Sequence, residues 1–73
     1  MKLPHGLMEI HLHGRDHDIK LVVESPETVR QVLVQAGILP STVLVSFENT
    51  ILPHATVLSQ SVKLLVTTVS SGG

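Results

Sequence analysis

Hydrophobic and polar residues alternate along two stretches near the start of the chain. Residues 7–13 place Met8, Ile10 and Leu12 at every second position, with polar residues between them. Residues 19–24 repeat this alternation after a short polar segment. A period of two is typical of a strand with one buried side, because successive side chains point to opposite faces. The two runs therefore predict an antiparallel hairpin.

The pattern changes to helical spacing over residues 25–36. Ser25 is a favourable N-cap and Pro26 suits the first helical position, so the helix is predicted to begin there. Gly37 favours a left-handed residue at the C-terminal end, and Pro40 prevents continuation. The apolar residues at i, i+3, i+4 and i+7 are Val29, Val32, Leu33 and Ala36.

The second half of the chain is predicted to be mostly extended. Residues 42–47 are rich in β-branched side chains, and residues 62–69 form one of the most apolar runs. Between them we expect a turn at 48–50, a short extended piece at 51–53, and a connection in which Val57 and Leu58 fill the core. The last strand is expected in the middle of the sheet, next to the first. The order of elements predicts an α+β fold, a mixed sheet of four to five strands with one helix across one face.

The length allows one small domain. The chain has 73 residues, of which 42% are hydrophobic, and it has no cysteine. A chain of this size buries only about 60% of its unfolded surface, too little for a core together with a deep substrate cavity. Without cysteine it has no disulfides, no four-thiolate zinc site and no cysteine nucleophile. We therefore do not expect a self-contained enzyme.

Charge and aromatic content argue against other classes of partner. Five Lys and Arg face six Asp and Glu, and the chain has one aromatic residue, Phe47. A base-stacking platform and a phosphate-tracking stripe are both missing, so direct binding of nucleic acid is not expected. No apolar run approaches the roughly 18 residues that span a bilayer, and the N-terminal pattern is not that of a signal peptide. The expected location is the cytoplasm.

Four segments carry a resemblance to a known family. They are residues 28–33, residues 43–45, residues 51–53, and residues 62–65 running to the terminal Gly72-Gly73. In this order the chain resembles the ubiquitin-like β-grasp proteins. The more similar branch comprises the small sulfur carriers and modifiers: the thiamine sulfur carrier, the small subunit of molybdopterin synthase, the ubiquitin-related modifier and the archaeal small modifiers. The resemblance implies a β-grasp domain at 1–69 and a flexible tail at 70–73.

The resemblance implies that chemistry occurs at the C-terminal carboxylate of Gly73. An ATP-dependent activating enzyme would adenylate it, and the adenylate would become a thiocarboxylate for sulfur transfer or an isopeptide bond to a lysine. Sulfur could pass to tRNA thiolation, molybdopterin or thiazole, and the sequence does not choose among these or between transfer and conjugation. Gly72 and Gly73 lack Cβ atoms, so the backbone can enter a narrow channel. The chain itself would bind no cofactor, since ATP belongs to the partner enzyme.

Strand alternation also predicts a surface for that partner. Leu44 and Leu65 are expected on the open face of the sheet, the one that the helix does not cover, where Val22 would join them in an apolar patch. Thr67 and Val69 complete the predicted docking surface.

Histidines and lysines supply weaker candidates. His11 and His13 lie two apart on a strand and could ligate a metal together with His17 of the following loop, but the pattern favours exposed polar side chains on the solvent face. Lys20 and Lys63 are candidate acceptors for isopeptide bonds. Two other functions therefore stay open beside the carrier: a β-grasp interaction module with an inert tail, and a small metal-binding protein.

Overall fold

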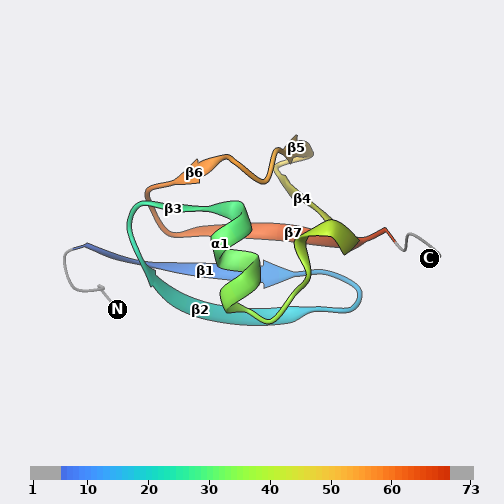
Figure 1. Cartoon of the computed structure of the whole chain (residues 1–73), viewed down its shortest axis with the longest axis horizontal. Helices are drawn as coiled ribbons and strands as arrows, with labels where there is room; N and C mark the ends of the chain where they lie inside the picture. The colour runs from blue at the N-terminus through green and yellow to red at the C-terminus, as the bar shows by residue number, and fades with distance from the viewer. Residues whose placement is uncertain (1–5, 70–73) are drawn as a thin grey trace.

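A computed structural model describes residues 6–69 of the chain. Within these residues one helix packs against a five-stranded sheet, and a second, two-stranded sheet lies beside it (Figure 1). This is the predicted α+β architecture, and it is β-grasp-like. The elements in chain order are β1 (Leu7–His13), β2 (Asp18–Glu24), β3 (Glu27–Thr28), α1 (Val29–Gln35), the 3-10 helix η1 (Pro40–Thr42), β4 (Val43–Phe47), β5 (Thr50–Leu52), β6 (Val57–Leu58) and β7 (Val62–Thr68).

The last strand lies at the centre of the main sheet. The strand order is β2-β1-β7-β4-β5. β1 and β2 form the predicted antiparallel hairpin, while β7 runs parallel to β1 and antiparallel to β4. The prediction that the final apolar strand is central and adjacent to the first is confirmed. Its central position places Leu64 and Val66 under the helix, while the alternate residues of the strand face outward.

The core lies between α1 and the inner face of the sheet. The alternating residues of β1 that were predicted to point inward, Met8, Ile10 and Leu12, are at most 1% exposed. Each such side chain stabilises the fold by about 1.5–3 kcal/mol relative to its exposed state. The buried hydrophobic residues are Met8, Ile10, Leu12, Val23, Val29, Val32, Leu33, Ile38, Val43, Val45, Leu58, Leu64 and Val66.

The helix begins three residues later than predicted. Its N-cap is Thr28, not Ser25, and the Thr28 hydroxyl accepts a hydrogen bond from the Gln31 backbone N–H at 3.1 Å. The Gln31 side chain in turn accepts from the Thr28 N–H at 2.9 Å. This reciprocal capping box satisfies two of the free N–H groups of the first turn. The prediction was wrong because residues 27 and 28 pair with β6 as a short strand and so cannot be helical.

The connection between β5 and β7 is more ordered than the sequence indicates. Leu58 fills the core as predicted, with 8% exposure, but Val57 is 61% exposed. Both lie in β6, and neighbouring residues of a strand point to opposite sides, so they cannot both be buried. The turn predicted at 48–50 joins β4 and β5, with positive φ at both Glu48 (48°) and Asn49 (68°). Gly37 has the predicted left-handed conformation after α1, with φ of 81°.

Candidate functional site

The proposed site of activation follows the end of β7. Gly72 and Gly73 lie outside the described residues. The nearest described part of the chain is the end of β7. The strand ends at Thr68, and the backbone N–H of Val69 donates a hydrogen bond to the carbonyl oxygen of Thr42 at 2.8 Å. The chain is therefore held to the η1–β4 junction as far as Val69.

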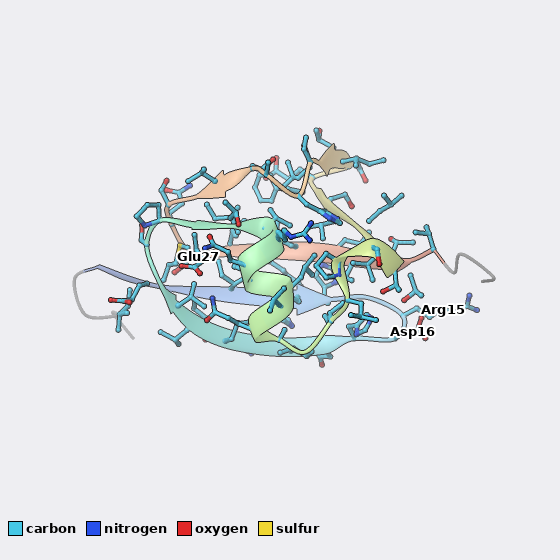
Figure 2. The ribbon with its side chains drawn as sticks, in the orientation of Figure 1. Arg15, Asp16 and Glu27 are labelled. Carbon is cyan, nitrogen blue, oxygen red and sulfur yellow. The ribbon has the colours of Figure 1, made fainter. Side chains whose placement is uncertain are left out.

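The β1–β2 turn lies at the same end of the sheet. Because β1 and β7 are parallel and His13 is in register with Leu65, the residues after β1 lie beside the last part of β7. Figure 2 shows Arg15 and Asp16 of this turn pointing away from the domain at the end where β7 finishes. The surroundings of the chain exit therefore combine an exposed charged turn with the η1–β4 junction.

Gly14 allows the turn to approach β7 this closely. A Cβ atom on Gly14 would lie 2.2 Å from the carbonyl oxygen of Val66, which is a backbone atom in the centre of the sheet. Any other residue at this position requires the turn or the central strand to move. The pattern of the chain gives no signal for this contact, since it depends on how β1 pairs with β7.

An apolar patch lies on the open face of the sheet, across β7, β4 and β5. Ser46 of β4 is in register with Leu65 on one side and Ile51 on the other, and Leu44 is in register with Thr67. Residues directly opposite one another in an antiparallel ladder share a face. Leu44 and Leu65 are each 41% exposed and Ile51 is 61% exposed. We call Leu44, Ile51 and Leu65 the open-face patch.

Three of the four predicted docking residues stand together at this patch. Leu44, Leu65 and Thr67 occupy neighbouring positions, and Val69 is exposed just beyond the end of β7. Val22 does not belong to the group. It is exposed on the same face, but it lies on β2 opposite Glu9, and β1 separates it from β7. Ile51, and not Val22, completes the patch. The pattern of the sequence did not predict this, because the three residues of β5 are too few to show its register.

A polar band borders the patch on β1, β2 and the first part of β7. His11 is in register with Lys20 on one side and Lys63 on the other. Its Nε2 lies 2.7 Å from Oδ1 of Asp18. A carboxylate only accepts hydrogen bonds, so Nε2–H of His11 is the donor. This hydrogen bond, together with the charge of the imidazole, lowers the pKa of the Asp18 carboxyl below its ordinary value.

The histidines do not form a metal site within residues 6–69. The rings of His11 and His13 lie on the same face with their centroids 5.7 Å apart. No group of three or more His, Asp or Glu in this part of the chain is arranged to hold a metal ion. Lys20 and Lys63 are exposed. The one ion pair among the described residues joins His11 and Asp18, so neither lysine takes part in an ion pair there.

A cavity of about 230 Å³ opens between β4, β5, β6 and the start of β7. It lies on the inner side of the sheet, and its wall is apolar apart from uncharged Thr, Ser and Gln residues. Since none of its lining side chains is an acid, a base or a cysteine, the cavity offers no group for proton transfer or nucleophilic attack. Its apolar lining includes Phe47, Leu52, Leu58, Val62 and Leu64.

Two further findings concern the chain as a whole. The part of the chain that the structure describes contains no helix long and apolar enough to cross a membrane. No family model and no curated protein matches the sequence. The β-grasp-like assignment therefore stands on the strand order and on the helix that covers one face of the sheet.

Proposed function

We propose that this protein is a ubiquitin-like sulfur carrier or protein modifier, and that a separate ATP-dependent enzyme activates its Gly73 carboxylate. The observation that carries the proposal is the position of β7. This strand is the central one of a β-grasp-like sheet, and Gly73 is the fourth residue after Val69, the last residue that the structure describes. The reactive group is the same whether Gly73 ends the gene product or is exposed by processing.

The reaction requires a leaving group on the carboxylate. An oxygen of the Gly73 carboxylate attacks the α-phosphorus of ATP, pyrophosphate departs, and a mixed anhydride with AMP forms. A hydrosulfide ion then displaces AMP and loses its proton to leave a thiocarboxylate, or a lysine amine displaces AMP and loses a proton to leave an amide. The chain has no cysteine and no phosphate-binding glycine loop. The nucleotide site and the acid–base groups therefore belong to the activating enzyme.

The short distance from Val69 to Gly73 sets where that enzyme must bind. Four residues span at most about 14 Å when fully extended, so the nucleotide site has to come close to the end of β7. The enzyme would then contact the β1–β2 turn and the open-face patch at the same time. The exposed side chains of Leu44 and Leu65 supply apolar area for that contact. Lys20 and Lys63 are acceptors of the right chemistry if copies of the protein are joined to one another.

Exchange of labelled pyrophosphate into ATP tests the activation step. The reagents are the purified protein and a purified adenylating enzyme of the ubiquitin-activating type from the same organism. We expect exchange that depends on the added chain and disappears when Gly72 and Gly73 are deleted. A chain with Gly73→Ala is the matched control, because it keeps the length of the tail and adds one Cβ. Exchange that is unaffected by the deletion would overturn the proposal.

The exposed patch also favours a second function, an interaction module whose tail is inert. Three large apolar side chains gathered on one face suit a protein partner whatever the tail does. The same deletion separates the two functions. A module without Gly72 and Gly73 keeps its partner with unchanged affinity, whereas a carrier loses activation while its fold is retained.

A further inference from the structure

The two edges of the main sheet differ in how they are protected. β5 is three residues long and is followed at once by Pro53, which shortens the edge that it offers. β2, at the opposite edge, has seven residues and contains no proline. Its register with β1 is continuous from Glu24 to Asp18, so no bulge interrupts it. Among residues 6–69, β2 lies along the border of the sheet with no further strand beside it (Figure 1).

Such an edge presents a row of unpaired backbone N–H and C=O groups. Natural sheets block edges of this kind with short strands, prolines, bulges, covering elements or charged side chains, because a free edge pairs with another strand. Of these devices β2 has only its charges, which would oppose an uncharged or like-charged partner but not a complementary one. Val22, on the open face of β2, is 50% exposed. On the inner face, Ile19 and Leu21 are only partly buried against the core. A strand added at this edge would cover apolar area on both faces of β2.

The open-face side chains of β2 select a partner strand by charge. They are Asp18, Lys20, Val22 and Glu24 in order along the strand. Lys20 and Glu24 flank Val22 at equal spacing with opposite charges. In residues 6–69 neither takes part in an ion pair. The sequence of charges is therefore complementary to itself when it is read in the opposite direction about Val22.

Three antiparallel self-pairings overlap five or more residues of β2 and can be compared directly. A two-fold axis through Lys20 would place two lysines opposite each other, and an axis through Leu21 would place Asp18 opposite Glu24 of the partner subunit. An axis through Val22 places Lys20 opposite Glu24 of the partner subunit twice, with the two Val22 side chains in contact between these pairs. Opposite charges at directly facing positions stabilise a ladder by about 0.2–1 kcal/mol each, and like charges destabilise it.

We propose that this protein self-associates through β2, with two copies pairing antiparallel about a two-fold axis at Val22. The pairing joins the two five-stranded sheets into one continuous sheet through about four to six backbone hydrogen bonds. The interface is small, so the dimer is weak and forms as the protein concentration rises. It leaves the open-face patch free, because β1 lies between β2 and β7. This inference does not depend on the function of the tail.

Sedimentation equilibrium with charge-swapped variants tests the proposal. We expect the native chain to dimerise in a concentration-dependent way, and added salt to weaken the dimer. Lys20→Glu and Glu24→Lys each place like charges opposite each other, so each should raise the dissociation constant about tenfold or more. The double variant Lys20→Glu/Glu24→Lys restores opposite charges and should restore the dimer. Lys63→Glu is the matched control, since it makes the same change of charge on β7 and should leave the dimer intact.

Cysteine cross-linking tests the register. The chain has no cysteine, so Val22→Cys introduces its sole thiol. We expect this variant to form a disulfide-linked dimer under mild oxidation far faster than Leu44→Cys, whose thiol would lie on the open-face patch. Circular dichroism and thermal melting of each variant establish that it is folded.

Three results would overturn the proposal. One is a native chain that stays monomeric at millimolar concentration or pairs only with an unrelated extended peptide. Another is a dimer that tolerates both single charge swaps. The third is cross-linking at Leu44 that is as fast as cross-linking at Val22.

Discussion

The two faces of the central strand β7 have opposite surroundings. Leu64 and Val66, on the inner face, are 0% and 1% exposed, whereas Leu65 between them is 41% exposed on the open face. Leu65 therefore differs in burial from both of its neighbours in the strand, although all three residues are large and apolar. The inner positions hold the domain together against α1, and the open positions are accessible for the partner contact that we propose. A stabilising position and an exposed one are thus separated by one residue along the chain.

The largest effect is expected at Leu64. Leu64→Ala would leave a cavity among fully buried side chains and should lower the free energy of unfolding by about 2–5 kcal/mol. Leu65→Ala removes the same atoms from the other face and should change stability by no more than about 0.5 kcal/mol. Urea denaturation followed by circular dichroism measures both. Equal losses at the two positions would contradict the difference between the faces.

A smaller loss of stability is expected where the β1–β2 turn meets β7. Gly14→Ala places a methyl group against the carbonyl oxygen of Val66, and the backbone must shift to relieve the overlap. We expect a loss of about 1–3 kcal/mol, measured by the same denaturation experiment. Gly37→Ala makes the same chemical change in open space at a positive φ and serves as a comparison for backbone strain alone. A Gly14→Ala chain as stable as the native one would show that the turn does not pack on β7 in this way.

Leu65→Asp tests whether the open face serves recognition. The substitution puts a charge at the centre of the open-face patch while leaving the inner face unchanged. We expect thermal stability close to that of the native chain and a fall in the rate of activation by about tenfold or more. The measurement is pyrophosphate exchange at limiting concentrations of the chain. Ile51→Asp should act in the same direction, whereas Val22→Asp, outside the patch, should leave activation unchanged.

The smallest effect concerns pH. The pKa of Asp18 is lowered in the folded chain by its hydrogen bond with His11, so the folded state binds its proton less readily than the unfolded state. The contribution of Asp18 is therefore complete above the ordinary aspartate pKa of 3.8 and is lost as the pH falls below that value. Asp18→Asn should flatten the acid limb of a plot of melting temperature against pH. An unchanged acid limb would show that the pair with His11 does not stabilise the fold.

The alternation of residues predicted the two faces well and the helix start poorly. The strand pattern of β1, β2, β4 and β7 is long enough to assign each residue to a side, so the core and the exposure of Leu44 and Leu65 followed from it. At the helix, Ser25-Pro26 and the pair Thr28–Gln31 are both acceptable starts. Pairing of residues 27 and 28 with β6 decided between them, and two-residue strands leave no recognisable pattern in a sequence.

The composition of the site was harder to predict because it depends on register. Ile51 joins the open-face patch only because Ser46 pairs with it, and Gly14 matters only because β1 pairs in parallel with β7. Val22 was misplaced for the same reason: alternation assigns a face but not a distance across the sheet. The self-complementary charges of β2 are visible in the sequence, yet they acquire meaning only once β2 is known to be an edge strand.

The most direct test of the proposed function is the chemical state of Gly73 in the living cell. The protein would be isolated from its own organism without exposure to strong nucleophiles, and its C-terminal peptide analysed by mass spectrometry. The account predicts a population in which the Gly73 carboxylate carries sulfur in place of one oxygen or is joined to a lysine side chain. If every molecule instead continues beyond Gly73, or ends there with an unmodified carboxylate under all growth conditions, the account is contradicted.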